Sequence, residues 1–306
     1  MKTLIIIIVI FFSNFVHAEE TLFSDLKIVS NTPLKNFTTT DIKKCIFRLT
    51  DNMIYVLDHS ENILWQFTAN GSFRQKLLLN DLPLQLVAPV KGMKARVTDF
   101  CPQKNGNIIL SEGNTASIYE IDMNGRVINQ IKMNNSPLAV NIIDGDTIIV
   151  IDQDFHSKYL RLMLTSGKIL AEIKFDKSQI KTGFKEYNTK IDYFFIKKNV
   201  LFIFASINNE ILKCVITGAN IIIESKYWLS QPIKSKYIGY NGNSHKLWVK
   251  GIAMNGDNTY VQIDCNSKKI KYTTDNLYNS FIGIGIQKFD FYYYLTPRRL
   301  ISYAYK

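Results

Sequence analysis

The sequence of 306 residues lacks the short motifs that mark common catalytic and nucleotide-binding sites. It has no G-x-x-x-x-G-K-[ST] or G-x-G-x-x-G loop, so it offers no glycine-rich phosphate cradle. It has no G-x-S-x-G turn and no alternation of helix and strand that would hold a serine nucleophile. Histidine is scarce: beyond residue 18 only His59, His156 and His245 remain, in separate segments, which disfavours a zinc site.

Long hydrophobic runs are absent after the first residues. LIIIIVIFF (4–12) covers about half of a membrane span. Lys2 precedes this run and VHA (16–18) follows it, which is the pattern of a secretory signal peptide. We therefore expect a signal peptide at 1–18 and a secreted or periplasmic chain over 19–306, with a retained membrane anchor as the alternative. No cysteine adjoins the cleavage position, so a lipid cannot be attached there.

Acidic residues are fewer than basic ones, 26 against 37, which gives a net charge of +11. The basic residues are spread over lysine-rich loops. Such a surface can attract anionic lipid, polysaccharide or nucleic acid, but solvated lysine is the simpler interpretation. Since an exported protein rarely meets nucleic acid, we expect no nucleic-acid partner, and no stable membrane insertion after the leader is removed. Hydrophobic residues make up 46% of the chain, enough for the core of one large domain.

One pattern of strands repeats along the chain. MIYVLD (53–58), ILWQFTA (63–69) and the turn Asn70-Gly71 give its first clear copy. Later copies place Gly125, Gly167, Gly218 and Ser267 at the equivalent turn, with spacings of 54, 42, 51 and 49 residues. A period of this length built only of strands is typical of β-propeller blades, and Asn-Gly is typical of tight hairpin turns.

Each blade also needs an innermost strand, and candidates precede the clear strand pairs. The candidate for the innermost strand of the sixth blade is FIGIGIQ (281–287). It is followed by DFYYYLT (290–296) and LISYAYK (300–306), so the last blade is one strand short. DLKIVS (25–30) is apolar enough to supply it. We expect an all-β, six-bladed β-propeller whose ring is closed by this N-terminal strand, because closure removes exposed sheet edges. An open β-sandwich or two smaller domains is the alternative.

The four cysteines are an even number in a compartment that permits disulfides. Cys45 and Cys101 fall on innermost strands of consecutive blades, where they could meet. Cys214 and Cys265 fall on third strands, which fan apart, so a bond between them is less favourable. Buried free thiols are the alternative for both pairs.

The loops between the second and third strands of each blade should meet on one face of a propeller. Carboxylates gather there, including Glu61 and Glu210, together with two histidines and the arginines of TPRR (296–299). This concave rim suits a polar ligand. We therefore predict a ligand-binding rim of Asp58, His59, Glu112, Asp152, Asp154, His156, Asp257 and Arg298. Turn chemistry is the alternative, because Asp and Asn often end strands by bonding their own turns.

IYVLD, the gap and ILWQFTANG, with their copy in the next blade, resemble the repeat of the NHL and gluconolactonase-like (TolB-like) six-bladed propellers over residues 42–175. The resemblance implies a metal-dependent lactonase or esterase as one function, with a divalent cation, usually calcium, in the channel. Asp99, Asn141, Asp192 and Asn241 are the inner-strand oxygen donors that could hold Ca²⁺. The glutamate that such enzymes place in the first blade has no counterpart in KKCIFRLT (43–50).

These observations favour a binding protein that recognises a peptide, glycan or protein through the loop face, with no catalytic residues. A calcium-dependent lactonase-like or esterase-like hydrolase is the alternative, and Ca²⁺ is its only implied cofactor.

Overall fold

The structure is a computed structural model. The residues it describes are 26–41, 45–50, 52–82, 96–154, 157–176, 191–197, 199–205, 210–230, 233–241, 245–253, 258–274, 284–285, 291–295 and 298–305. They form β-strands and one short 3-10 helix, η2 (Leu79–Asp81). Within these ranges, no helix has the length and apolarity that a membrane crossing requires. The predicted signal peptide lies outside the described residues.

The strands fall into six four-stranded sheets. Sheet 1 contains β2 (Cys45–Leu49), β3 (Met53–Asp58), β4 (Ile63–Thr68) and β5 (Phe73–Leu78), and sheet 2 contains β6 (Val97–Pro102), β7 (Ile108–Glu112), β8 (Ser117–Ile121) and β9 (Val127–Lys132). Sheet 3 contains β10 (Ser136–Asp144), β11 (Thr147–Gln153), β12 (Ser157–Leu164) and β13 (Ile169–Asp176), and sheet 4 contains β14 (Ile191–Lys197), β15 (Val200–Ala205), β16 (Glu210–Thr217) and β17 (Asn220–Trp228). Sheet 5 contains β18 (Ile233–Asn241), β19 (Lys246–Ala253), β20 (Asn258–Asp264) and β21 (Ile270–Thr274), and sheet 6 contains β1 (Leu26–Pro33), β22 (Ile284–Gly285), β23 (Phe291–Leu295) and β24 (Arg299–Tyr305).

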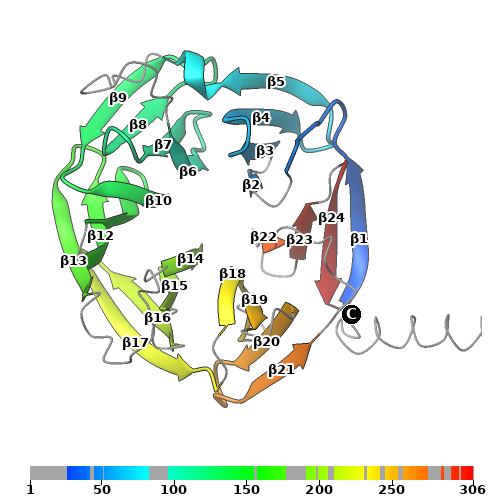
Figure 1. The fold of residues 1–306 in the computed structure, drawn as a ribbon, viewed down its shortest axis with the longest axis vertical. Coiled ribbons are helices and arrows are strands. Elements are labelled where there is room, and N and C mark those ends of the chain that lie inside the picture. Colours follow the sequence, from blue (N-terminus) through cyan, green and yellow to red (C-terminus); the bar gives the residue numbers. More distant parts are fainter. Residues whose placement is uncertain are drawn as a thin grey trace, which may run out of the picture.

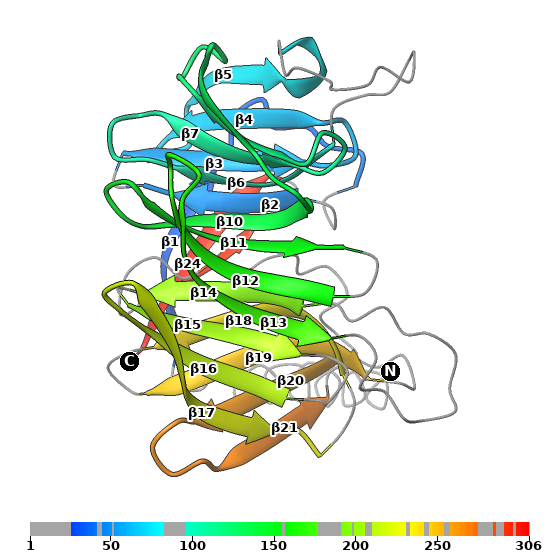
Figure 2. The same ribbon diagram turned by 90° about the vertical axis from the view of Figure 1, so that its left-hand side faces the viewer.

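The sheets stand side by side around a central axis (Figure 1). In sheets 1 to 5 the first strand of the sheet is innermost, and in sheet 6 the innermost strand is β22. Neighbouring strands within each sheet are antiparallel. Seen from the side, successive sheets are stacked against one another (Figure 2). This arrangement confirms the prediction of an all-β propeller.

The N-terminal strand closes the ring. β1 pairs with β24 along its whole length, from Leu26 opposite Tyr305 to Pro33 opposite Arg299. The backbone N–H of Leu34 extends the pairing by donating to the Arg298 carbonyl at 2.8 Å. The prediction that a strand starting near residue 25 completes the last sheet is therefore confirmed, and the strand continues three residues further than expected.

Burial explains why the repeat could be read from the sequence. All six residues of β3 are buried, and so are all five of β7. The outermost strands β5 and β9 bury one residue each. A strand covered on both faces has no polar face to alternate with, so it appears as an uninterrupted apolar run such as MIYVLD.

Apolar clusters fill the spaces between neighbouring sheets. Tyr55 of sheet 1 packs against Phe100 of sheet 2, with ring centroids 6.4 Å apart. Similar clusters join sheet 2 to sheet 3, sheet 3 to sheet 4, and sheet 4 to sheet 5. A fifth joins sheet 1 to the closing sheet, where Trp65, Phe37 and Leu300 meet.

The turns that end the third strands need left-handed backbone. Gly71, Gly125, Gly167 and Gly218 have positive φ, as their alignment in the repeat predicts. At the fifth copy the left-handed residue is Lys268, with φ 57°, one position after Ser267. Gly71 has a second constraint, because a Cβ atom there would lie 2.0 Å from the Pro33 carbonyl oxygen at the end of β1.

The prediction that Cys45 and Cys101 could form a disulfide is wrong. All four cysteines are free, and the alternative of buried thiols holds for Cys45, Cys101 and Cys214, whereas Cys265 is half-buried. The Cys101 thiol instead donates to Asn141 Oδ1 of the next sheet at 3.0 Å. Burial raises the pKa of Cys45 to about 12 and that of Cys101 to about 11, so both thiols stay protonated and unreactive at neutral pH.

Replacing Gln66 by methionine is expected to stabilise the protein. The Gln66 side chain is fully buried on β4 opposite Tyr55, and neither of its amide atoms has a hydrogen-bond partner. Because an unsatisfied buried amide costs about 1 to 3 kcal/mol, Gln66→Met should raise the urea midpoint. The matched control is Gln75→Met, which removes the hydrogen bond from Gln75 Nε2 to the Met123 carbonyl and should lower it. A lower midpoint for Gln66→Met would contradict this account.

Candidate functional site

The predicted rim carboxylates Asp58, Glu112, Asp152 and Asp154 lie where the second strands of their sheets end, and three of the four bond to their own turns. Asp58 is fully buried, and its Oδ1 accepts hydrogen bonds from the backbone N–H of Ser60 at 2.8 Å and from the Ser60 hydroxyl. Glu112 is also fully buried. Its Oε2 accepts from the backbone N–H of Thr115 at 2.5 Å and from the Thr115 hydroxyl.

Asp152 and Asp154 lie at the end of β11 in sheet 3 and differ in how they are held. Asp152 pairs with the Arg161 guanidinium, and its Oδ1 accepts from Asn135 Nδ2 at 3.2 Å. Asp154 accepts from the backbone N–H of Ser157 at 2.6 Å and from the Tyr159 hydroxyl at 2.8 Å. Three of the four rim carboxylates therefore have the local structural role that the turn-chemistry alternative anticipated, whereas Asp152 is held by Arg161 of the neighbouring strand and by Asn135. The part of all four carboxylates in ligand binding stays a prediction.

The remaining rim residues are distributed differently. His156 and Asp257 lie outside the described residues. Arg298 is exposed, at the point where β1 and β24 meet. Glu210 is buried beside Lys226, with its Oε1 3.3 Å from Lys226 Nζ. Among the six predicted rim residues that the structure describes, His59 is the one that lines the pocket described below.

The predicted calcium ligands are occupied by protein groups where the structure describes their side chains. Asp99 is buried and pairs with Arg48, whose NH2 lies 3.1 Å from Oδ1 and 3.3 Å from Oδ2. The same carboxylate accepts from the backbone N–H groups of Phe100 and Val140. Burial raises the pKa of Asp99, and the Arg48 guanidinium opposes that rise.

Asn141 is also engaged, because its Oδ1 accepts from both the Cys101 thiol and the backbone N–H of Ile142. Asp192 and Asn241 fall on β14 and β18, at positions whose side chains are not described. A cation at Asp99 would have to displace a guanidinium, so Asp99 and Asn141 in this arrangement do not fit a calcium site. The calcium ion itself stays a prediction from the resemblance.

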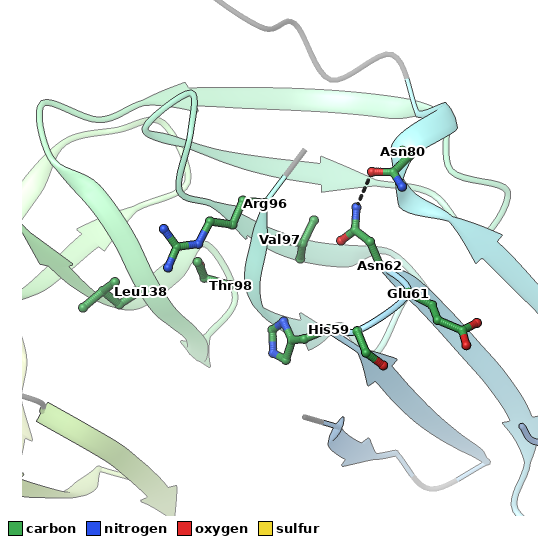
Figure 3. A pocket seen from close by; sticks show the side chains of 9 residues that line it. His59, Glu61, Asn62, Asn80, Arg96, Val97, Thr98 and Leu138 are labelled. Carbon is green, nitrogen blue, oxygen red and sulfur yellow. Dashed lines mark hydrogen bonds between the residues drawn. The ribbon is translucent and has the colours of Figure 1, made fainter. Parts of the chain in front are cut away.

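A pocket of ≈ 600 Å³ lies on the loop face at the junction of sheets 1 and 2 (Figure 3). The β3–β4 loop, η2, the start of β6 and one residue of β10 enclose it. Most of the described residues that line it are polar, and they are His59, Ser60, Glu61, Asn62, Asn80, Arg96, Val97, Thr98 and Leu138.

Several polar groups of this lining are fixed in place. Asn62 Nδ2 donates to Asn80 Oδ1 at 2.8 Å, which ties the β3–β4 loop to η2. The Thr98 hydroxyl bonds to the Pro137 carbonyl at 2.9 Å, which ties sheet 2 to sheet 3. Burial lowers the pKa of His59 from its usual 6.5, although Asp99 and a hydrogen bond to the Val97 backbone oppose this shift. The imidazole is therefore neutral at pH 7.

The rim carboxylate of Glu112 positions the pocket residue Arg96. Glu112 Oε1 accepts from the backbone N–H of Arg96 at 2.7 Å, and the Arg96 carbonyl accepts from the backbone N–H of Gly113 at 2.9 Å. Arg96 is thereby held at the start of β6 with its side chain exposed. Glu112 therefore contributes to the site by holding the backbone of Arg96 in place.

Sequence reasoning missed Arg96, Thr98, Asn80 and Leu138. The segments RVTDFCPQ (96–103) and PLAVNIID (137–144) have the apolar pattern of inner strands, so Arg96, Thr98 and Leu138 could have been placed near the rim at the start of these strands. Asn80 had no such signal, because its place depends on how η2 packs.

Comparisons with known proteins give the fold. No protein-family model matches the chain, and no curated protein matches its sequence significantly. A Bacteroides fragilis protein, provisionally described as exported, has 12% identity and a TM-score of 0.64, over 93% of this chain and 96% of its own. Virginiamycin B lyase from Staphylococcus aureus has 12% identity and a TM-score of 0.53, over 92% of this chain and 100% of its own. Hydrazine synthase from Kuenenia stuttgartiensis has 12% identity and a TM-score of 0.56, over 85% of this chain and 76% of its own.

Proposed function

We propose that this chain is an exported binding protein that takes a polar ligand in the pocket between sheets 1 and 2. The proposal treats each four-stranded sheet as one of six blades. The pattern of residues 1–18 supports export, and the Bacteroides fragilis protein of the same fold is provisionally described as exported.

The pocket is the observation that carries the proposal. Its volume of ≈ 600 Å³ lies inside the range of about 300 to 1,000 Å³ typical of ligand sites. Seven of the nine described lining residues are polar, so they can bond to peptide or sugar groups. Val97 and Leu138 give it a small apolar wall. The hydrogen bonds of Asn62, Thr98 and Glu112 hold the lining before a ligand arrives, which lowers the entropy cost of binding.

The binding function is favoured over the hydrolase. Asp99 is the candidate calcium ligand on sheet 2, and its ion pair with Arg48 leaves it unavailable to a metal ion. The described pocket residues also contain no bonded pair of nucleophile and base, which covalent catalysis would need.

Filling the pocket is expected to abolish ligand binding. Asn80 lines the pocket and is exposed, so Asn80→Trp would place an indole across the space without entering a core. Labelled protein would be applied to peptide and glycan arrays, and the Asn80→Trp protein should lose at least 90% of the signal on the spots that the wild type binds, about 1.4 kcal/mol.

The matched control is Asn124→Trp, an exposed position in the β8–β9 turn, which should keep the wild-type pattern. Thermal unfolding of both variants checks that they are folded. If Asn80→Trp keeps every spot, the binding site lies elsewhere.

A further inference from the structure

We infer that the ligand of this pocket carries one acidic and one basic group, as a short peptide segment with both kinds of side chain does. The inference rests on the proposed function, because it specifies the ligand of the same pocket. It follows from the two charged side chains that the lining leaves without a partner.

Arg96 and Glu61 line the same pocket from different sheets. Both are exposed. Within the described part of the chain, the Arg96 guanidinium and the Glu61 carboxylate make no hydrogen bond or ion pair with any protein group. Nearby, Arg48 is paired with Asp99. The two unpaired groups are therefore available to a third molecule.

Figure 3 shows why the two groups do not neutralise each other. Glu61 lies in the β3–β4 loop at one end of the lining, and Arg96 lies beyond Asn62 and Val97 toward Leu138. In Figure 3 the Glu61 carboxylate points outward at the edge of the loop, so a ligand that extends from Arg96 across the pocket and past this edge meets a guanidinium at one end and a carboxylate at the other.

The residues between these ends add no net charge. His59 is neutral at pH 7 because burial lowers its pKa, and the amides and hydroxyls of the lining are uncharged. A purely anionic ligand would be attracted by Arg96 and repelled by Glu61, and a purely cationic ligand would experience the reverse. Only a molecule with both charges compensates both ends, and charge-assisted hydrogen bonds are about twice as strong as neutral ones.

The remaining features fit a peptide. Ser60, Asn62 and Asn80 also line the pocket, and their amide and hydroxyl groups can bond to a peptide backbone. Val97 and Leu138 offer apolar contact to the aliphatic parts of long charged side chains, which commonly cover apolar surface in this way.

Capped tripeptides test this inference by isothermal titration calorimetry at pH 7. The probes are acetyl-Lys-Ala-Glu-amide and acetyl-Glu-Ala-Lys-amide, with acetyl-Gln-Ala-Glu-amide and acetyl-Lys-Ala-Gln-amide as the singly charged controls. At least one doubly charged peptide should bind ten times more tightly than either singly charged peptide. Uncapped Ala-Ala-Ala, which carries its charges only at its termini, distinguishes terminal recognition from side-chain recognition.

Two variants assign the charges. Arg96→Gln should remove the tenfold advantage of the doubly charged peptide over acetyl-Lys-Ala-Gln-amide, because the peptide glutamate loses its partner. Glu61→Gln should remove the advantage over acetyl-Gln-Ala-Glu-amide, because the peptide lysine loses its partner. Arg126→Gln and Asp144→Asn, which change exposed charges in other turns, should leave both advantages intact.

Equal affinities for all capped peptides, or no binding of any, would overturn the inference. So would an unchanged preference in both pocket variants. A charge preference lost in Asn80→Trp supports the pocket as the site, whereas wild-type binding by Asn80→Trp removes the proposed function along with the inference. If the peptides bind with equal affinity and Asn80→Trp abolishes that binding, the inference on charge is wrong and the proposed function is kept.

Discussion

Deleting β1 is expected to abolish the cooperative fold. A chain that starts at Leu34 lacks the outermost strand of sheet 6, and β24 loses seven paired positions, from Tyr305 to Arg299. An open, unpaired strand edge invites pairing between chains. The deletion also removes Pro33, against which the Gly71 turn packs. We expect the truncated protein to aggregate or to unfold without a sharp urea transition, a loss comparable to the whole stability of about 5 to 15 kcal/mol.

Two comparisons make this test specific. A chain that lacks only residues 1–18 should keep the urea midpoint of the chain that begins at Leu26, because the closing strand is intact. A synthetic peptide of residues 24–36, added to the truncated chain during refolding, should restore a monomeric peak in gel filtration. A truncated chain that stays monomeric with an unchanged midpoint would show that β1 does not close the ring.

The fold could be predicted because its determinants are local. MIYVLD is a run of buried residues within one strand, and Asn70-Gly71 is a turn within one hairpin, so both can be recognised without knowledge of distant contacts. The closing strand followed from counting strands in the last blade. Each of these signals concerns residues that are neighbours along the chain or members of one repeat.

The site was harder to predict because it depends on contacts between sheets. Asp58 and Glu112 have the residue type of a binding site, yet Asp58 Oδ1 and Glu112 Oε2 are bonded to N–H and hydroxyl groups two or three residues away. Glu112 Oε1 bonds to the backbone N–H of Arg96. The thiol of Cys101 faces Asn141 of the next sheet, and spacing along the chain does not reveal that choice. Arg96 belongs to the pocket only because sheets 1, 2 and 3 meet there.

The ion pair of sheet 3 should give the largest effect of a single substitution. Arg161 binds Asp152 through one guanidinium nitrogen and Glu172 through Nε at 2.6 Å, and it lies over the Tyr159 ring at 4.7 Å. Asp152 is fully buried. Arg161→Met leaves that carboxylate without its cation, and breaking a buried pair in this way costs about 3 to 5 kcal/mol. Urea unfolding at pH 7 should show a loss of this size.

The pH dependence identifies Asp152 as the cause of that loss. Burial raises the pKa of Asp152 to about 6, although Arg161 opposes the rise, whereas an unfolded aspartate titrates near 3.9. A carboxyl group with a raised folded pKa stabilises the fold below its unfolded pKa, and this contribution is lost as the pH rises through about 6. In Arg161→Met the opposing cation is gone, so the folded pKa of Asp152 rises further. Between pH 6 and pH 7 the folded wild type is ionised and loses no further stability, whereas the variant continues to lose it. Lowering the pH from 7 to 5 should therefore recover about 1.4 kcal/mol of the loss, the equivalent of one pKa unit. The double variant Asp152→Asn/Arg161→Met has no carboxylate to protonate, so its stability relative to wild type should not show this recovery. An equal deficit for Arg161→Met at pH 5 and pH 7 would mean that the arginine acts through Glu172 or its contact with Tyr159 instead of through the buried charge of Asp152.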